Sequence, residues 1–372
     1  PLTPDINLSS AYAFSNFKEL EKYHIDPINN QRYSRDSNAI SRQVELYFSK
    51  IYDDSNTFLF NSGMSAIMAA VSILAEEVDM IVTFGIYYRK TESIINMLNK
   101  TRGINVINLE NEKQIENLDK TKRMLFVLEV PSNPFLRLID IKKIKDSFIY
   151  SKIILDFTLS GLLNCTDMIN LADISISSCT KYISGHNDLL GGLVVIKDDS
   201  LSRRIWDYRS MAGTLIDPFS SYLLLRSLRT YDLRLSSMLE NIKYVLDYLN
   251  DSGFVRRIFY PGLYDNSDQN KLVDNYLTHS GSLVSFALDP NIDLKHNIEQ
   301  LCSIKMAPSF GSIDSLIEIP LYMSRVSESV KISSSNDLMH DLLLSQSFCR
   351  LSVGCEPIEY LINDLDKLIR LS

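Results

Sequence analysis

Short apolar runs and helical patterns alternate along the chain from about residue 57 to residue 196. The runs are short and rich in Val, Ile, Leu and Phe, whereas the segments between them repeat apolar residues at helical spacing. Apolar strands separated by helices are typical of a mostly parallel sheet that is covered on both faces. The pattern therefore predicts an α/β fold. The expected strands are 57–60, 80–84, 104–107, 124–130, 153–155, 174–178 and 193–196, and the helices among them are 64–76, 92–99 and 141–150.

The two ends of the chain depart from this alternation. Residues 1–37 are largely polar and begin without a clear period, so we expect an extended N-terminal arm. From Asp217 a long helical pattern runs to about Asn250, and less regular strands and helices follow, ending in a helix over 357–371. We expect a main domain over 38–226 and a smaller α+β domain over 227–372.

Composition excludes several classes of protein. The formal net charge of −8 argues against nucleic acid or an anionic membrane surface as the main partner. No apolar run approaches the roughly 18 residues of a membrane span, and the N-terminus shows no secretory signal. The five cysteines are scattered and include no CxxC pair, which indicates reduced thiols rather than a disulfide framework or a metal site. These features predict a cytoplasmic protein with a small-molecule partner.

One lysine occupies a position suited to chemistry. The stretch 175–192 leads from a predicted strand through small hydroxyl residues to Lys181 and then to a loop rich in glycine. Ligand sites of open α/β sheets lie at the carboxyl ends of the strands. A lysine among Ser and Thr rather than carboxylates is suited to forming a Schiff base with a carbonyl cofactor. The alternative is an ordinary solvated lysine.

Three further segments end or follow predicted strands. The turn 61–66 opens a helix, so the amides of Gly63 and Met64 are candidates for binding an anion, although a plain turn has the same pattern. Asp156 either caps a neighbouring helix or faces a protonated ring nitrogen. Two prolines in the segment 129–134 favour an ordered turn that presents Asn133 at the same edge of the sheet.

Other candidates are equivocal from the residues alone. Tyr33 and Arg35 combine a hydroxyl with a phosphate-binding guanidinium. Tyr88 offers an aromatic plane for a flat cofactor, or simply packs in the core. Arg350 lies inside an apolar strand pattern and therefore needs an anion, either a protein carboxylate or a substrate carboxylate. Ser309 lies in a loop whose hydroxyls and amides are candidates for binding the same anion.

In their order along the chain and their residue types, these segments resemble the Cys/Met-metabolism pyridoxal phosphate enzymes. This family includes cystathionine synthases and lyases, methionine γ-lyases and homoserine sulfhydrylases. The resemblance runs nearly end to end. It implies fold type I of the pyridoxal phosphate enzymes, similar to aspartate aminotransferase, and trans-sulfuration chemistry: β- or γ-elimination, or γ-replacement, on a sulfur-containing or homoserine-derived amino acid. The matching motifs lie at 33–38, 62–64, 129–134, 156–158, 178–186, 188–192, 217–230, 260–263, 309–311, 315–317 and 350–354.

The resemblance also implies roles for the candidates. Lys181, Tyr88 and Asp156 would be catalytic: Lys181 forms the internal aldimine with pyridoxal 5′-phosphate and moves protons, Asp156 keeps the pyridine nitrogen protonated, and Tyr88 stacks on the ring. Asn133, Ser309 and Arg350 would bind the substrate, and Asn133 would also contact the ring hydroxyl of the cofactor. The expected phosphate ligands are Gly63, Met64, Ser178 and Thr180 of one subunit with Tyr33 and Arg35 of its neighbour. The active unit would thus be a dimer, usually paired into a tetramer, with the main domain binding the cofactor and the arm contacting the neighbouring subunit.

Departures from the family pattern concern the substrate. Pro308 stands where cystathionine-handling members often carry glutamate, which makes cystathionine a doubtful substrate. Arg89 and Lys90 replace a glycine-rich loop and argue against a standard methionine γ-lyase; they suit an anionic or acylated side chain, or face solvent. The alternatives left open are a homoserine-ester sulfhydrylase, a γ-replacement enzyme of a specialised pathway, and a non-catalytic regulator that binds the cofactor.

Overall fold

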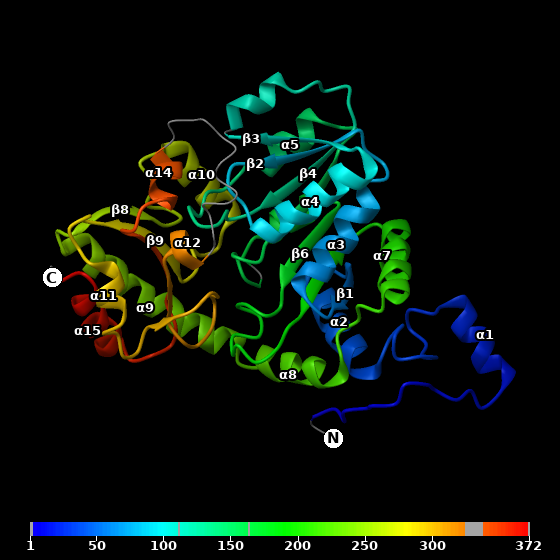
Figure 1. Ribbon diagram of the computed structural model, residues 1–372. Helices are drawn as coiled ribbons and strands as arrows, with labels where there is room; N and C mark the ends of the chain where they lie inside the picture. The colour runs from blue at the N-terminus through cyan, green and yellow to red at the C-terminus, as the bar shows by residue number, and fades with distance from the viewer. Residues whose placement is uncertain (1–2, 111, 163, 324–337, 371–372) are drawn as a thin grey trace.

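The computed structural model describes residues 3–110, 112–162, 164–323 and 338–370 (Figure 1). Its larger sheet has seven strands in the order β1-β7-β6-β5-β4-β2-β3. Strands β2 to β6 pair in parallel, whereas β7 runs antiparallel to both β1 and β6. The predicted α/β class and mostly parallel sheet are confirmed. The strands are β1 (Asn56–Phe60), β2 (Met80–Phe84), β3 (Asn105–Leu109), β4 (Met124–Glu129), β5 (Lys152–Asp156), β6 (Ile174–Ser178) and β7 (Gly192–Ile196).

Helices bury both faces of this sheet, because successive residues of each strand point to opposite sides. In β5, for example, Ile154 packs with one hydrophobic cluster and Leu155 with another. The first cluster includes α3 (Gly63–Leu74), α4 (Arg89–Arg102) and α7 (Asp199–Ala212). The second includes α2 (Ala39–Ile51), α5 (Ile141–Ser147), α6 (Thr166–Leu171) and α8 (Pro218–Leu228).

A second sheet of five strands, in the order β10-β11-β12-β9-β8, lies beside the first (Figure 1). The two faces of β12 again contact different parts of the protein. Leu351 packs against helices on one face, and Phe348 on the other face stacks on Phe135 from the turn after β4. Arg350 shares the face of Phe348, so it faces the larger sheet. The strands are β8 (Val255–Phe259), β9 (Leu283–Leu288), β10 (Lys305–Met306), β11 (Leu316–Glu318) and β12 (Phe348–Ser352). Helices α9 (Tyr231–Asp251), α11 (Leu294–Ile298) and α15 (Ile358–Leu368) cover the opposite face, and η1 (Glu112–Asn117), α10 (Ser267–Tyr276), α12 (Pro320–Met323) and α14 (Leu338–Leu343) complete the elements.

The structure differs from the sequence expectations in two helical regions. The arm contains a helix, α1 (Phe17–Ile25), because Asn16 caps it: its Oδ1 accepts the Glu19 amide at 3.0 Å. The single helix expected from Asp217 to Asn250 is two helices, α8 and α9, with a break at residues 229–230. The expected domain boundary at 226/227 falls in the last turn of α8 and stays a prediction. Residue 371, at the end of the expected C-terminal helix, lies outside the described residues.

The described residues lack two kinds of feature. No helix there is long and apolar enough to cross a bilayer. Likewise, no group of three or more His, Cys, Asp or Glu side chains in the described ranges is arranged to hold a metal ion.

Candidate active site

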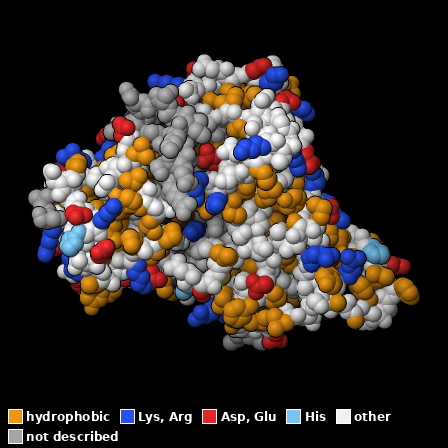
Figure 2. All heavy atoms as spheres, in the orientation of Figure 1, with side chains coloured by type: hydrophobic (Ala, Val, Ile, Leu, Met, Phe, Trp, Pro, Cys, Tyr) orange, Lys and Arg blue, Asp and Glu red, His pale blue; other side chains and the backbone are white. Residues whose placement is uncertain are grey.

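A cleft of about 1750 Å³ opens at the carboxyl ends of β4, β5 and β6 and extends to the second sheet. Figure 2 shows Lys and Arg side chains bordering the hollow between the two parts of the molecule. Every site residue expected from the sequence lines this cleft except Tyr33 and Arg35. The residues brought together are Gly63, Met64, Tyr88, Asn133, Asp156, Ser178, Thr180, Lys181, Ser309 and Arg350.

Lys181 follows β6 in a tight turn and directs its amine into the cleft. Its Nζ donates a hydrogen bond to the Ser309 Oγ at 2.8 Å and lies 5.0 Å from the centre of the Phe310 ring. Burial, together with the positive charge of Arg350, lowers the pKa of Lys181 to about 8. An amine with this pKa is neutral, and therefore nucleophilic, in a much larger fraction of molecules at neutral pH than an ordinary lysine is.

The turn between β1 and α3 forms a candidate anion cradle. Ser62 caps α3, because its Oγ accepts the Ser65 amide at 3.1 Å. A Cβ at Gly63 would lie 3.0 Å from the Cβ of Ser178, so glycine permits a close approach of α3 to β6. The positive end of α3 thus lies beside the hydroxyls of Ser178 and Thr180, which suits a phosphate.

Asp156 ends β5 and is half-buried in the wall of the cleft. It accepts hydrogen bonds from the amide of Thr158 at 3.0 Å and from its hydroxyl, so it caps a local turn and not a helix. Burial raises the pKa of Asp156 despite these bonds. A protonated ring nitrogen beside Asp156 would offset this penalty, because an adjacent cation favours the ionised carboxylate. The anion cradle, the amine and this carboxylate together fit pyridoxal phosphate.

Arg350 was expected to pair with either a protein carboxylate or a substrate carboxylate, and the structure contains the protein carboxylate. In the antiparallel register of β11 and β12 it lies opposite Glu318, and the two form a buried ion pair. The guanidinium also donates from Nη1 to the Asn133 Oδ1 at 2.8 Å and from Nη2 to the Ser309 carbonyl at 3.3 Å. Arg350 therefore joins the other two residues expected to bind substrate, and its role toward a substrate carboxylate stays a prediction.

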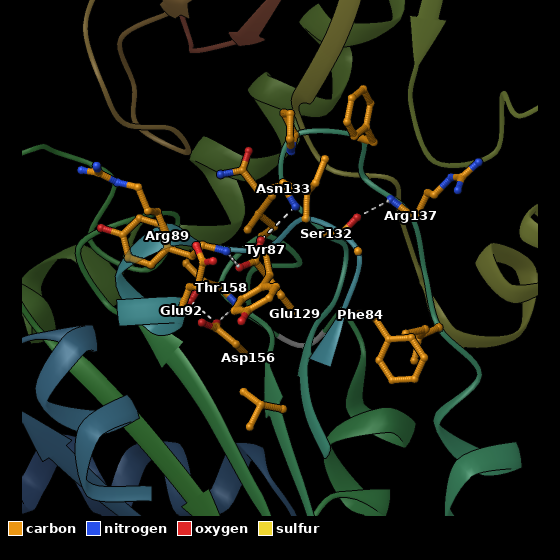
Figure 3. Close-up of a pocket in the computed structure, with 18 of the residues that line it drawn as sticks. Phe84, Tyr87, Arg89, Glu92, Glu129, Ser132, Asn133, Arg137, Asp156 and Thr158 are labelled. Atoms are coloured by element: carbon orange, nitrogen blue, oxygen red, sulfur yellow. Dashed lines mark hydrogen bonds between the residues drawn. The ribbon is translucent and has the colours of Figure 1, made fainter. Parts of the chain in front are cut away.

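Two glutamates of the cleft, the buried Glu318 and the half-buried Glu129, were missed as functional candidates. Glu318 is the partner of Arg350, and the only signal in the sequence is a charged residue that follows the short apolar run 316–317. Glu129 ends β4, where its Oε2 accepts the Tyr88 amide and its Oε1 the Asn133 amide, both at 2.9 Å. Figure 3 shows Glu129 between Asp156 and Asn133. Burial and the neighbouring Asp156 raise the pKa of Glu129.

Tyr33 and Arg35 lie at the base of the arm, outside the cleft of their own chain. The Arg35 guanidinium lies over the Tyr33 ring, with its Cζ 5.2 Å from the ring centre. Arg35 lines a separate cavity of about 390 Å³ with Arg32, Arg203 and the buried Asp36. Their expected place in a neighbouring subunit's site stays a prediction.

The three residues that depart from the family pattern all line the cleft. Arg89 opens α4 directly after Tyr88 and is half-buried, whereas Lys90 is exposed. Figure 3 shows the Arg89 side chain directed away from Asp156. Pro308 directly precedes Ser309. The positions that distinguish this chain therefore border the space next to the expected substrate ligands.

Comparison with known proteins agrees with this geometry. The family model described as "Cys/Met metabolism PLP-dependent enzyme" matches residues 2–370. A cystathionine β-lyase of Lactococcus lactis subsp. cremoris is 28% identical over 343 residues, covering 91% of this chain and 88% of that protein. A cystathionine γ-synthase of Escherichia coli (strain K12) is 28% identical over 376 residues, covering 99% and 93%. Among solved structures, a cystathionine γ-lyase from Lactobacillus plantarum in complex with L-serine superposes with a TM-score of 0.84 at 27% identity, covering 98% of this chain and 92% of that one.

Proposed function

Because the chain belongs to the family of Cys/Met-metabolism enzymes that depend on pyridoxal phosphate, we propose that it catalyses β- or γ-elimination, or γ-replacement, on a sulfur-containing or homoserine-derived amino acid. One arrangement carries this proposal: the buried amine of Lys181 lies 2.8 Å from Ser309, in the same cleft as Asp156 and Arg350. A nucleophilic amine, a carboxylate for a cationic ring and a guanidinium for a carboxylate are the groups that such chemistry requires.

The residues of the cleft divide into cofactor and substrate ligands. When bound, pyridoxal phosphate supplies an electron sink for a negative charge that develops at the substrate Cα. Asp156 would keep the ring nitrogen protonated, and Tyr88 would pack against the ring. The amides of Gly63 and Met64 and the hydroxyls of Ser178 and Thr180 would bind the phosphate.

With the cofactor bound, Lys181 would act as the base that removes the Cα proton of the substrate. Its lowered pKa supports this role, because a base works best when its pKa lies near the working pH. Arg350, Ser309 and Asn133 bind the α-carboxylate and orient the Cα–H bond toward Lys181. Tyr88 helps protonate the leaving group.

We further propose that the active unit is a dimer in which Tyr33 and Arg35 reach the neighbouring subunit's phosphate site, with two dimers forming a tetramer. The arm supports this proposal, because Leu8, Phe17 and Ile25 are 76%, 82% and 84% exposed on it. Apolar side chains gathered on a projecting segment are typical of a surface that another protein covers.

The proposed location is the cytoplasm. The five cysteines are free thiols, which suits this reducing compartment: Cys165, Cys179, Cys302, Cys349 and Cys355.

The substrate side chain is expected to be anionic or acylated. Pro308 supplies no carboxylate for the distal ammonium of cystathionine, while Arg89 and Lys90 add positive charge to the same cleft. A γ-replacement on a homoserine ester in a specialised pathway is the variant of the proposal that these three residues favour. A regulator that binds the cofactor without catalysis has no need of the Lys181–Ser309–Arg350 arrangement.

The test has two stages. The purified protein is loaded with pyridoxal phosphate and reduced with borohydride, and its peptides are mapped by mass. The modification is expected on Lys181, and the corresponding peptide of the Lys181→Arg variant is expected to stay unmodified. The wild type is then incubated with homoserine esters, cystathionine, cysteine and methionine, with and without a thiol. Turnover of a homoserine ester supports the proposal, whereas rapid keto-acid release from cystathionine contradicts the role given to Pro308. An unmodified Lys181 contradicts the catalytic function itself.

A further inference from the structure

The carboxylate of Glu129 connects two loops that carry different residues of the site. Its Oε2 accepts the amide of Tyr88 at the start of α4, and its Oε1 accepts the amide of Asn133 in the proline turn after β4. Both distances are 2.9 Å, which is the usual length of an N–H···O bond. Tyr88 and Asn133 belong to separate loops, and this one side chain bridges them.

These two bonds extend a chain of hydrogen bonds that reaches the reactive amine. The Asn133 Oδ1 accepts from the Arg350 Nη1 at 2.8 Å, and the Arg350 Nη2 donates to the Ser309 carbonyl at 3.3 Å. The Ser309 Oγ in turn accepts from Lys181 at 2.8 Å. Glu129 is thus the link between this series and the loop of Tyr88.

Only an acidic side chain fits this position. Both donors are backbone N–H groups, so both partner atoms must be acceptors, and a carboxylate of this length provides two. Glutamine has the same shape but one acceptor, and its NH₂ group would meet one of the two N–H donors. Keeping a carboxylate here is unfavourable, because Glu129 lies in register beside Asp156, and desolvation and that neighbouring carboxylate raise the pKa of Glu129. A group retained against this penalty indicates a specific requirement.

We propose that Glu129 is a positioning residue that fixes Tyr88 and Asn133 relative to each other across the cleft. This inference rests on the proposed function, in which Tyr88 packs against the cofactor and Asn133 binds the substrate. Glu129 itself touches neither. Its removal therefore disturbs both partners at once without removing a ligand of the cofactor or of the substrate.

The test compares Glu129→Gln with a matched control, Glu45→Gln. Glu45 is a buried carboxylate that accepts the Leu59 amide at 2.9 Å and pairs with Arg209, but it does not line the cleft. We expect Glu129→Gln to lower kcat/KM by about tenfold or more, the usual effect of leaving one buried donor unpaired at a site. Glu45→Gln is expected to lower the melting temperature and leave the kcat/KM of the folded fraction unchanged.

Double variants separate positioning from a general loss of stability. If Glu129 acts through its two partners, combining Glu129→Gln with Tyr88→Ala or with Asn133→Ala must reduce kcat/KM by clearly less than the product of the single effects. Independent, multiplicative effects in both pairs would overturn the proposal, as would a Glu129→Gln variant that loses only stability. If Glu129→Gln does not fold, Glu129→Asp, whose shorter side chain reaches only one of the two amides, takes its place in the same cycles.

A readout without turnover keeps this inference distinct from the proposed function. The affinity for L-alanine, which has no leaving group, is measured from the visible absorbance of the cofactor-loaded protein. Glu129→Gln is expected to weaken this affinity about tenfold, and Glu45→Gln to leave it unchanged. A wild type that binds L-alanine but turns over no substrate contradicts the proposed function alone. Equal affinities of the wild type and Glu129→Gln contradict the role of Glu129 alone.

Discussion

Lys181 differs from an ordinary lysine in its surroundings in the fold as well as in its immediate sequence. It is buried, its hydrogen-bond acceptor is the neutral Ser309, and the cation Arg350 lies near enough to disfavour its charged form. Glu318 opposes this effect but is itself paired with Arg350. The outcome is a reactive amine whose protonation depends on a buried ion pair.

The protonation of Lys181 predicts a pH dependence for cofactor capture. Because the pKa is lowered to about 8, the neutral amine of the cofactor-free protein appears as pH rises through about 8, well below the range of an ordinary lysine. The rate at which Lys181 captures pyridoxal phosphate, measured by borohydride trapping at a series of pH values, should therefore be half-maximal near pH 8. Arg350→Ala removes the nearby cation and should move this midpoint to higher pH.

Lys305 provides an internal control for the same digests. It is exposed, and its hydrogen bond and ion pair with Asp314 raise its pKa. Its modification should therefore increase only at higher pH than that of Lys181. Coincident midpoints for the two lysines would contradict the assignment of a buried, perturbed amine.

At the scale of elements, local pattern was enough to bring part of the site together. The apolar runs in the sequence predicted β4, β5 and β6. Because parallel strands present their carboxyl ends at one edge of a sheet, Asp156, Ser178 and Lys181 were expected to lie close together. The sequence did not predict the pairing of Glu318 with Arg350. This pairing depends on the register between β11, a strand of only three residues, and β12, which lies farther along the chain. The bond from Glu129 to the Tyr88 amide likewise depends on how two loops cross.

The strand pairing of β11 and β12 predicts a large effect of removing one charge. Glu318→Gln leaves the Arg350 guanidinium buried without its carboxylate, which typically costs about 3 kcal/mol of the free energy of unfolding. The midpoint of thermal unfolding should fall accordingly. The matched control is Glu76→Gln, which breaks pairs with Arg102 and Arg204 at the surface, where Glu76 is 59% exposed. Such exposed pairs contribute at most about 1 kcal/mol, so equal losses of stability in the two variants would contradict a buried pair.

At the scale of the whole molecule, alternation of strands and helices predicted the larger sheet, but it carried no information on the arm. The polar sequence of the arm concealed α1, whose start depends on a single Asn16 cap. The arm is anchored at its base, where the Arg209 Nη2 donates to the Asp36 carbonyl at 3.3 Å, and it then leads away from the cleft of its own chain (Figure 1). Figure 2 shows Lys and Arg side chains gathered at this base. Tyr33 and Arg35, the two remaining candidate phosphate ligands, thus lie outside the cleft that contains Gly63, Met64, Ser178 and Thr180 of the same chain.

This separation predicts complementation between two inactive variants. Arg35→Ala chains retain Lys181, and Lys181→Ala chains retain Arg35, so a mixed dimer contains one site with both residues if Arg35 acts in the neighbouring subunit. Co-expression of the two variants should restore about a quarter of the wild-type activity, the share of complete sites after random pairing in a two-fold dimer. Each variant expressed alone sets the baseline. If Arg35 acts within its own chain, no mixed dimer contains a complete site and activity stays at that baseline, because every chain lacks one of the two residues.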